Sequence, residues 1–480
     1  MNLYLYTQLP LLMGFAMLLL MSSFWPKSSG RFSHTITLVA LAVSAMLTAS
    51  LLDPGQEFFG GAIRVTVIGK VMAYACLGLA MLAVTLAESY LAKVHIQEMD
   101  FRLVVLAQAL GLSHLPLAGD LATLFIAFEL VSVSAYILAG FNHRDARANE
   151  SGMKYLVLGI FGSALFLLGI TFLYGATGEI HLAAIQGKIV EMMAGNQSSD
   201  LVLVRVSLVF FMGALFFKNG IAPFHFWLSD VYAGTNMASL GFLAAPAKVA
   251  TFGLLGLLLW GPFAPLNTAW TPILLVVAAA CAVFGNLQAI LQTRLKRILA
   301  YSSVSNAGFI LLSLLLDKAW AFMFYLVAYG FATLGMMAAF MALGTATSDV
   351  DEIEDLRGMG AKHPWVSTGL TWMLFSLAGI PLTAGFAAKF AIISEGLKPG
   401  MVTVPGLIPV LVMSVMFGLI SFFFYFKIVR ALWLPHDEMV PKLHQRRDPE
   451  WNPLIILGFC SLAILFLGIL MRLPGTPIGN

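Results

Sequence analysis

Residues 217–232 read FKNGIAPFHFWLSDVY, and they lie between two long apolar segments. Within this stretch a lysine, Lys218, is followed closely by Gly220 and Pro223. A charge at the centre of a bilayer costs about 2.5–3.5 kcal/mol on insertion scales. A proline in the interior of a helix costs ~3 kcal/mol. A membrane helix that keeps both features together indicates a functional break beside a charge.

The composition excludes a water-soluble surface. Of the 480 residues, 60% are hydrophobic and 11% are charged, whereas soluble domains carry ~25% charged residues. Cys76, Cys281 and Cys460 lie in separate apolar segments without metal-ligand spacing, and we interpret them as packing residues. The N-terminal apolar segment has no basic n-region and no small-residue cleavage site, so we expect the first span there and not a cleaved signal.

Apolar segments of the length needed to cross a bilayer recur along the whole chain. They predict an all-α integral membrane protein with about fourteen transmembrane helices. The expected spans begin near Leu5, Ser33, Val65, Phe101, Leu121, Met153, Leu203, Met237, Trp270, Ile298, Trp320, Trp365, Thr403 and Pro453.

The basic residues of the connecting loops divide unevenly between the two sides. One set of loops holds 15 lysines and arginines, with clusters around Arg144 and Lys296, and the other holds 6. The positive-inside rule places the richer set in the cytoplasm. With an even number of spans, both ends of the chain are then expected on the outer, periplasmic face.

Six lysines fall inside expected spans: Lys70, Lys154, Lys218, Lys248, Lys389 and Lys427. Long side chains near span ends can reach water, which explains Lys70 and leaves Lys154 and Lys427 open. Lys218, Lys248 and Lys389 lie deeper, and one acid, Glu129, joins them inside a span. Ionisable residues in such positions indicate a functional site.

A second stretch matches the first. Residues 376–390 read SLAGIPLTAGFAAKF, where Lys389 shares a span with Gly379 and Pro381. Lys218 and Lys389 are 171 residues apart, and the spans that start near Phe101 and Trp270 are 169 apart. Interrupted spans at matching places in two halves point to a transport site, although ordinary proline kinks are the alternative.

This spacing predicts two inverted five-helix repeats, each with a broken helix. The expected parts are a three-helix segment over 1–100, a first repeat over 101–262, a second repeat over 263–435, and a loop with the last helix over 436–480.

The buried charges suggest proton transfer. Burial disfavours the charged form of an amine and a nearby carboxylate favours it, so a buried lysine can change protonation state when its partner moves. Glu129 is the expected partner of Lys218, with Lys248 and Lys389 as further carriers. His225 follows the break and is the best polar relay candidate. A static salt bridge between Glu129 and Lys218 is the alternative.

Four stretches carry a family resemblance: LATLFIAFELVSVSAYILAGF, FKNGIAPFHFWLSDVY, FGNLQAILQTRLKRILAYSSVSNAGFILL, and LRGMG with SLAGIPLTAGFAAKF. Over about residues 65–435 the chain resembles the antiporter-like membrane subunits of respiratory NADH:quinone oxidoreductase (complex I). Among these it is most similar to the subunit N type, because the stretch ends in DVY at Tyr232. The large subunits of multi-subunit sodium/proton antiporters are related to the same family.

The resemblance implies a proton-translocating membrane subunit with no redox centre and no cofactor of its own. NADH, FMN, iron–sulfur clusters and quinone are then expected elsewhere in the complex. The expected partners are the antiporter-like M-type subunit, the small K-, J- and A-type subunits and the lipid of a bacterial inner membrane, with no nucleic acid. The family's charged axis maps onto Glu129, Lys154, Lys218, Lys248 and Lys389.

Three positions depart from the family pattern. Asn306 stands where many N-type chains carry histidine, TNMAS replaces a proline-rich stretch, and Lys70 replaces an aspartate. Two alternatives stay open: a subunit of a cation/proton antiporter or membrane-bound hydrogenase relative, and a structural module that conducts nothing. Copurifying redox subunits would separate the complex I interpretation from the antiporter.

Overall fold

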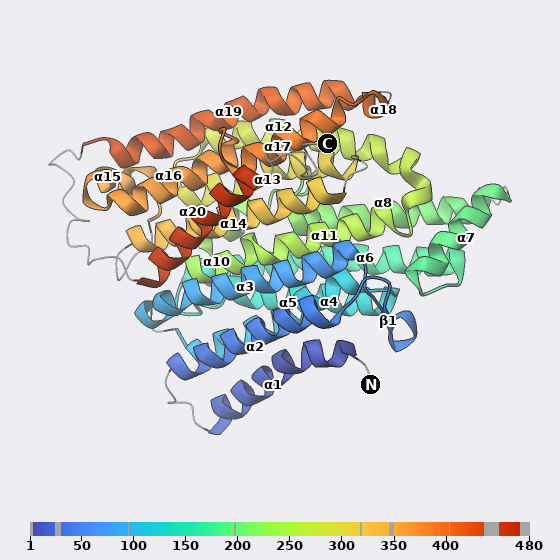
Figure 1. The fold of residues 1–480 in the computed structure, drawn as a ribbon, viewed down its shortest axis with the longest axis horizontal. Helices are drawn as coiled ribbons and strands as arrows, with labels where there is room; N and C mark the ends of the chain where they lie inside the picture. The colour runs from blue at the N-terminus through green and yellow to red at the C-terminus, as the bar shows by residue number, and fades with distance from the viewer. Residues whose placement is uncertain are drawn as a thin grey trace. The chain divides into compact units, whose positions relative to one another are not determined.

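The computed structural model describes residues 3–24, 30–94, 96–195, 198–316, 319–344, 350–402, 404–435 and 451–470. Helices dominate these ranges, which confirms the prediction of an all-α membrane protein (Figure 1). The helices are α1 (Leu3–Phe24), α2 (Gly30–Leu51), α3 (Val67–Val94), α4 (Glu98–His114), α5 (Leu121–Ala139), α6 (Ala146–Thr177), α7 (Leu182–Ala194), α8 (Ser198–Asn219), α9 (Leu228–Gly234), α10 (Met237–Ala244), α11 (Pro246–Trp260), α12 (Asn267–Leu291), α13 (Leu295–Leu314), α14 (Ala319–Leu343), α15 (Met359–Lys362), α16 (Pro364–Ala378), α17 (Ala384–Gly396), α18 (Pro399–Val402), α19 (Leu407–Trp433) and α20 (Trp451–Leu470).

Within the described residues, 12 helices are long and apolar enough to cross a membrane. Two expected spans have no counterpart in this set, and each has a structural reason. The span near Phe101 is α4, which has only 17 residues. The span near Trp365 is divided by its break into α16 and α17.

The helices pack into two units, and each is described by itself. The first comprises Met1–Val84, Gln97–Gly220 and Pro246–Ile273. The second comprises Thr85–Ile96, Ile221–Ala245 and Leu274–Asn480. Two of the boundaries fall at interruptions of helices, after Gly220 and after Ala245. The five-helix repeats stay a prediction.

In the first unit, α6 packs along α8 and α4 packs against α5 (Figure 1). Small residues bring α5 and α6 together, because a Cβ atom on Gly152 would lie 2.7 Å from the Cα atom of Gly140. The two backbones are therefore so close that neither position has room for a side chain. The two helices therefore present their aromatic side chains in a fixed register.

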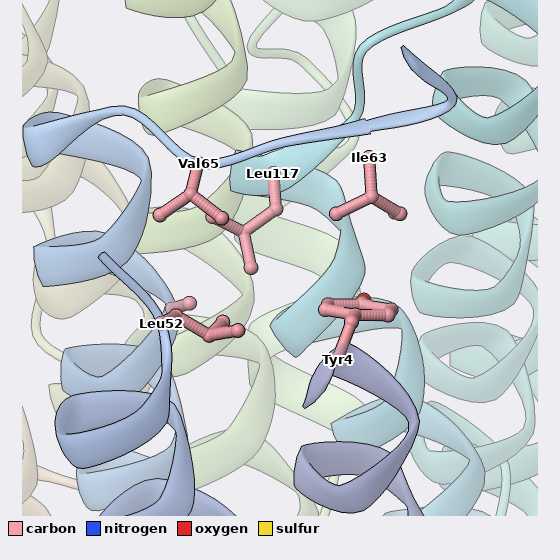
Figure 2. Packing of buried hydrophobic residues seen from close by; sticks show 6 residues of the cluster. Tyr4, Leu52, Ile63, Val65 and Leu117 are labelled. Atoms are coloured by element: carbon pink, nitrogen blue, oxygen red, sulfur yellow. The ribbon is translucent and has the colours of Figure 1, made fainter. Parts of the chain in front are cut away.

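A small sheet closes one end of the first unit. Strands β1 (Glu57–Phe58) and β2 (Ile63–Arg64) form an antiparallel hairpin, and isolated bridges join Ile63 to Ala118 and Asp120 to His181. The alternation of the expected spans puts all these residues on the same side of the membrane, which agrees with their meeting here. Figure 2 shows the apolar cluster beneath the hairpin, with the residues Tyr4, Leu52, Ile63, Val65 and Leu117.

A buried arginine connects α4 to α2 in the first unit through hydrogen bonds. Arg102 on α4 is 1% exposed, although it is one of the 15 basic residues that were assigned to the cytoplasmic loops. Its guanidinium donates to the carbonyl of Gly30 at 2.6 Å and to Ser33, and it lies 3.0 Å from the carboxylate of Glu98. The buried charge is thus paired, as its burial requires, and it ties α4 to the start of α2.

In the second unit, α14 lies at the centre and packs against α16, α17 and α20. Close packing again depends on a glycine: a Cβ atom on Gly335 would lie 2.5 Å from the sulfur of Met373 and 2.9 Å from the Cβ atom of Cys460. The thiol groups of all three cysteines are buried. Their predicted role as apolar packing residues agrees with this placement.

Candidate proton-transfer site

The first predicted break is present. Helix α8 ends at Asn219, and the next helix, α9, begins at Leu228. Gly220 has φ +64°, a left-handed conformation that favours glycine, and its N–H donates to the carbonyl of Phe217 at 3.0 Å. Pro223 lies exposed in the connecting turn. The break therefore leaves Lys218 in the last turn of α8.

The ammonium of Lys218 lies among aromatic rings. The residue is 5% exposed, and among the described residues its Nζ atom has no hydrogen-bond partner. The Nζ atom lies 4.6 Å from the ring centre of Tyr136, 5.1 Å from that of Tyr155 and 5.9 Å from that of Phe128. Phe128 and Tyr136 come from α5 and Tyr155 comes from α6, the helix that packs along α8.

Glu129 on α5 acts on Lys218 without touching it. The carboxylate is half-buried, and its Oε1 atom has no hydrogen-bond partner in the described part of the chain. Its charge nevertheless interacts electrostatically with Lys218 and with Tyr136. The two predicted partners are therefore close in the first unit, but the described residues form no static, hydrogen-bonded salt bridge between them.

Lys248 lies in the first turn of α11 and is 4% exposed. Directly before it, the expected eighth span is interrupted at Ala245, where φ is −116° and ψ is −82°, so that α10 and α11 are separate helices. This third interruption was not predicted from the sequence. Pro246 is compatible with it, because proline is tolerated in the first turn of a helix.

A hydrogen bond joins the helices of Lys218 and Lys248. The Thr251 hydroxyl on α11 donates to the Oδ1 atom of Asn219 at 2.7 Å, and the Asn219 amide donates to the carbonyl of Leu215 at 3.0 Å. Both residues are buried. Asn219 follows Lys218 directly and Thr251 lies one turn after Lys248. This bond therefore fixes the two lysine-bearing segments to each other.

The second predicted break is also present, in the second unit. Helix α16 ends at Ala378 and α17 begins at Ala384. Lys389 on α17 donates from Nζ to the carbonyl of Leu377 at 2.7 Å and to that of Ala378 at 3.3 Å. These are carbonyls of the last turn of α16, where a cation is favoured. Pro381 lies exposed in the turn.

Gly379 makes this arrangement possible. Its φ is +87°, which caps α16 in the left-handed conformation. A Cβ atom there would lie 3.0 Å from the Cδ atom of Lys389. The Nζ atom also lies 5.0 Å from the ring centre of Phe309 on α13. Among the described residues, Lys389 thus has a hydrogen-bonded environment that Lys218 lacks.

His225 lies in the turn after the first break, in the second unit. Its ring centre is 6.1 Å from that of Phe284 and 6.4 Å from that of Tyr301. The Tyr301 hydroxyl donates to Ser229 at 3.3 Å. His225 is half-buried, and it lies beside two aromatic rings, one of which carries the hydroxyl that is bonded to Ser229.

Lys154 lies outside the core of the first unit. Its side chain is 44% exposed, and Nζ lies 2.6 Å from the Glu150 carboxylate on the same face of α6. The structure therefore does not bring this side chain to the aromatic rings around Lys218, even though the next residue, Tyr155, is one of them. A surface pair of this kind stabilises little.

Asn306 forms the centre of a buried polar network on α13, α14 and α19. Its amide donates to the carbonyl of Ser302 at 2.9 Å, and its Oδ1 atom accepts from the Tyr325 hydroxyl at 3.0 Å. The hydroxyls of Ser302 and Tyr425 are hydrogen bonded to each other. Tyr325 in turn stacks on Phe309, the ring beside Lys389. Asparagine thus serves here as a link between three helices.

Several of these residues were not predicted from the sequence. Tyr136 follows Glu129 by two helical turns, a spacing that puts both on one helix face, so a signal was available. Asn219 directly follows Lys218, but its bond to Thr251 needs the tertiary structure. Glu395 on α17 was missed too: its side chain is 9% exposed and lies 2.7 Å from Lys398. No group of metal-ligating side chains occurs among the residues described.

The chain is similar to known membrane proteins over most of its length. Residues 118–417 match the family model described as NADH:quinone oxidoreductase/Mrp antiporter, TM. An NADH-quinone oxidoreductase subunit N from Azoarcus sp. is 33% identical, over 95% of this chain and 92% of the relative. Another, from Acidiphilium cryptum, is 33% identical over 92% and 90% of the two chains.

Solved structures extend the similarity. A chain of respiratory complex I from Thermus thermophilus, solved with bound aureothin, has a TM-score of 0.79 and 28% identity, and 98% of each chain is covered. A chain of the Mrp complex from Dietzia sp. has a TM-score of 0.81 over 98% of this chain and 95% of its own. Its identity is 18%, so it shows the fold alone.

Proposed function

Because the chain belongs to the family of transmembrane subunits shared by NADH:quinone oxidoreductase and Mrp antiporters, we propose that it is an N-type proton-translocating subunit of NADH:quinone oxidoreductase. It couples quinone reduction elsewhere in the complex to proton movement and has no redox centre of its own. The observation that carries this proposal is a lysine beside each of two helix breaks, buried in the case of Lys218 and partly buried in the case of Lys389. An apolar environment with polar groups freed at a break suits a charge that is transferred.

The first unit holds the proton on Lys218. The ammonium has no hydrogen-bonded partner among the described residues, so its charge depends on the rings and on the through-space effect of Glu129. Movement of Glu129 relative to Lys218 changes the balance between the charged and neutral amine. Lys248 is the next carrier, held in place by the bond between Asn219 and Thr251.

In the second unit, Lys389 receives and releases the proton. Carbonyls at the end of α16 favour its charged form. His225 serves as a relay at the turn that follows the first break, next to the hydroxyls of Tyr301 and Ser229. Lys154, paired with Glu150 on an exposed face, serves at the edge of the path.

The remaining components lie outside this chain. NADH, FMN, iron–sulfur clusters and quinone bind to other subunits. The direct partners are an M-type antiporter-like subunit and the small K-, J- and A-type subunits. The chain spans the bacterial inner membrane with both ends on the periplasmic face, as the distribution of lysine and arginine indicates.

The shared family model makes an Mrp-type cation/proton antiporter the second candidate. The two functions differ in their partners. Purification of the tagged chain from native membranes should recover flavin and iron–sulfur subunits if the first function holds. Recovery of small antiporter subunits without redox partners would assign the second.

Lys218→Ala tests the transfer function directly. In inverted membrane vesicles we expect NADH-driven proton uptake to fall to below about a tenth of the wild-type value, since a group that transfers protons contributes about 10²-fold or more. NADH oxidation recorded on the same sample should fall with it, while the complex stays assembled. The matched control is Lys188→Ala, which removes a solvent-exposed lysine from α7 that is paired with Glu191.

Normal uptake and oxidation in Lys218→Ala would contradict the proposal and would make the chain a structural module. Loss of the whole complex from the membrane would instead assign Lys218 a role in folding. The Lys188→Ala control separates both results from a general effect of removing a positive charge.

A further inference from the structure

The environment of Lys218 differs from that of a typical buried ion. A buried charge is normally in contact with an opposite charge or bound by hydrogen-bond acceptors. Here the Nζ atom has neither kind of contact among the described residues, although Lys218 is 5% exposed. What surrounds it instead are three aromatic rings, with their centres within 6 Å of the charge.

The rings are held in place by their own packing. Tyr136 and Tyr155 meet edge to face, with ring centres 4.7 Å apart and an interplanar angle of 84°. Phe128 stacks on Phe166 at 4.4 Å with an angle of 8°. Phe128, Tyr136 and Tyr155 are each 6% exposed or less. Rings fixed in this way keep their faces in one orientation toward the charge.

Glycine creates the space for the nearest ring. A Cβ atom on Gly159 would overlap the Cζ atom and the hydroxyl oxygen of Tyr136. The close approach of Gly140 and Gly152 brings α5 and α6 together one to two turns away. The backbone of two helices is therefore shaped so that Tyr136 can lie beside the lysine.

We propose that Tyr136, Tyr155 and Phe128 form an aromatic cage that stabilises the ammonium form of Lys218 by cation–π attraction. The attraction acts on the charge and not on individual N–H groups. Within the described part of the chain, all three N–H protons therefore remain without acceptors and available for transfer. The role of the cage in proton transfer rests on the proposed function, whereas the contact between the rings and the ammonium does not.

The alternative is that the rings only fill the core. The two interpretations differ in what a leucine does. Tyr136→Phe keeps the ring face and loses the hydroxyl, whereas Tyr136→Leu keeps apolar bulk and loses the ring. A cage tolerates phenylalanine and not leucine. If the rings only fill the core, the effect of Tyr136→Leu should be the same whether or not residue 218 carries a charge.

The test is a double-substitution cycle on the assembled complex. Tyr136→Leu and Tyr136→Phe are each measured in the wild-type background and in the Lys218→Met background, with the thermal midpoint of the purified complex as the first readout. We expect Tyr136→Leu to lower the midpoint in the wild-type background and to have less than half that effect in the Lys218→Met background. Tyr136→Phe loses the hydrogen bonds of the hydroxyl with Ser132 and Ser163, so it should lower the midpoint by a smaller amount that is the same in both backgrounds. Tyr174→Leu, at a 51% exposed tyrosine on α6, is the control.

Proton uptake per NADH oxidised is the second readout. We expect uptake to be retained in Tyr136→Phe and reduced severalfold in Tyr136→Leu. Equal effects of Tyr136→Leu with and without Lys218, or equal damage from phenylalanine and leucine, would overturn the cage. Normal pumping by Lys218→Met would overturn the proposed function. The thermal midpoints of the Tyr136 variants would still decide whether the cage stabilises the ammonium. If Tyr136→Leu does not assemble, the same pair of substitutions at Tyr155 decides.

Discussion

Gly379 is the residue on which the second break depends. Its backbone adopts φ +87°, which costs an L-residue about 1–2 kcal/mol. A methyl group there would also press on the Lys389 side chain at 3.0 Å. The position therefore combines a backbone requirement with a steric one.

We predict that Gly379→Ala destabilises the complex by about 1–2 kcal/mol and reduces proton uptake, because Lys389 is displaced from the carbonyls of α16. Thermal unfolding of the purified complex and vesicle uptake measure the two effects. Gly175→Ala is the control, since a Cβ atom on that glycine meets nothing within 4 Å. An unchanged Gly379→Ala complex would show that the cap is not needed.

At this scale the sequence predicted the charges better than their surroundings. Lys218, Lys248 and Lys389 are buried or partly buried as expected, because a lysine in an apolar segment is visible in the sequence. The acceptors of Lys389 are main-chain carbonyls of another helix, and every residue has such a carbonyl. Nothing in the sequence distinguishes Leu377 and Ala378 as the ones that it contacts.

At the scale of the helices, the hydrogen bond between α8 and α11 is the feature that can be tested. Thr251 donates to Asn219 across the two helices, and its hydroxyl also lies 2.9 Å from the carbonyl of Ala247 in its own helix. A hydroxyl has one proton to donate. Without Thr251, the buried Oδ1 atom of Asn219 loses the hydrogen bond that it accepts.

Thr251→Val keeps the shape and removes the hydroxyl. We predict a loss of about 0.6–1.7 kcal/mol, from the average to the largest value measured for hydrogen bonds between membrane helices, seen as a lower thermal midpoint of the complex. Thr171→Val is the control, because the exposed Thr171 hydroxyl donates to Leu167 in its own helix. Equal midpoints for the two variants would argue against a cross-helix role for Thr251.

Two of the three helix interruptions were predictable. Those after Lys218 and before Lys389 combine glycine, proline and a charge within a few residues. The interruption at Ala245 has only Pro246 as a signal, and proline at the first position of a helix is also compatible with a continuous kinked span. Whether the span is kinked or divided into two helices depends on the tertiary contacts of α10 and α11.

For the whole molecule, the orientation in the membrane is the next testable property. The three native cysteines are buried, so an impermeant thiol reagent reads only an introduced cysteine. We predict that Glu57→Cys, in the exposed hairpin, reacts from the periplasmic face and His143→Cys, in an exposed loop, reacts from the cytoplasmic face. Labelling of intact spheroplasts and of inverted vesicles measures this, and the reverse pattern would invert the proposed topology.

The span count was close to correct because hydropathy reports directly on the bilayer. Among the described residues, twelve helices are long and apolar enough to cross a membrane. The other two expected spans do not meet this criterion, because α4 is too short and the span near Trp365 is divided by its break. The small sheet over β1 and β2 was not predicted, since its strands have two residues each. Segments that short carry no periodicity that a sequence pattern can reveal.

The second break also has an evolutionary consequence. Gly379 supplies the conformation, α16 supplies the carbonyls and Lys389 supplies a cation of the length that reaches them. An acid at position 389 would meet the negative end of the helix, so it could not use this turn unchanged. We therefore expect a substitution at position 379 or 389 to be tolerated only when the other position, or the turn between them, changes with it.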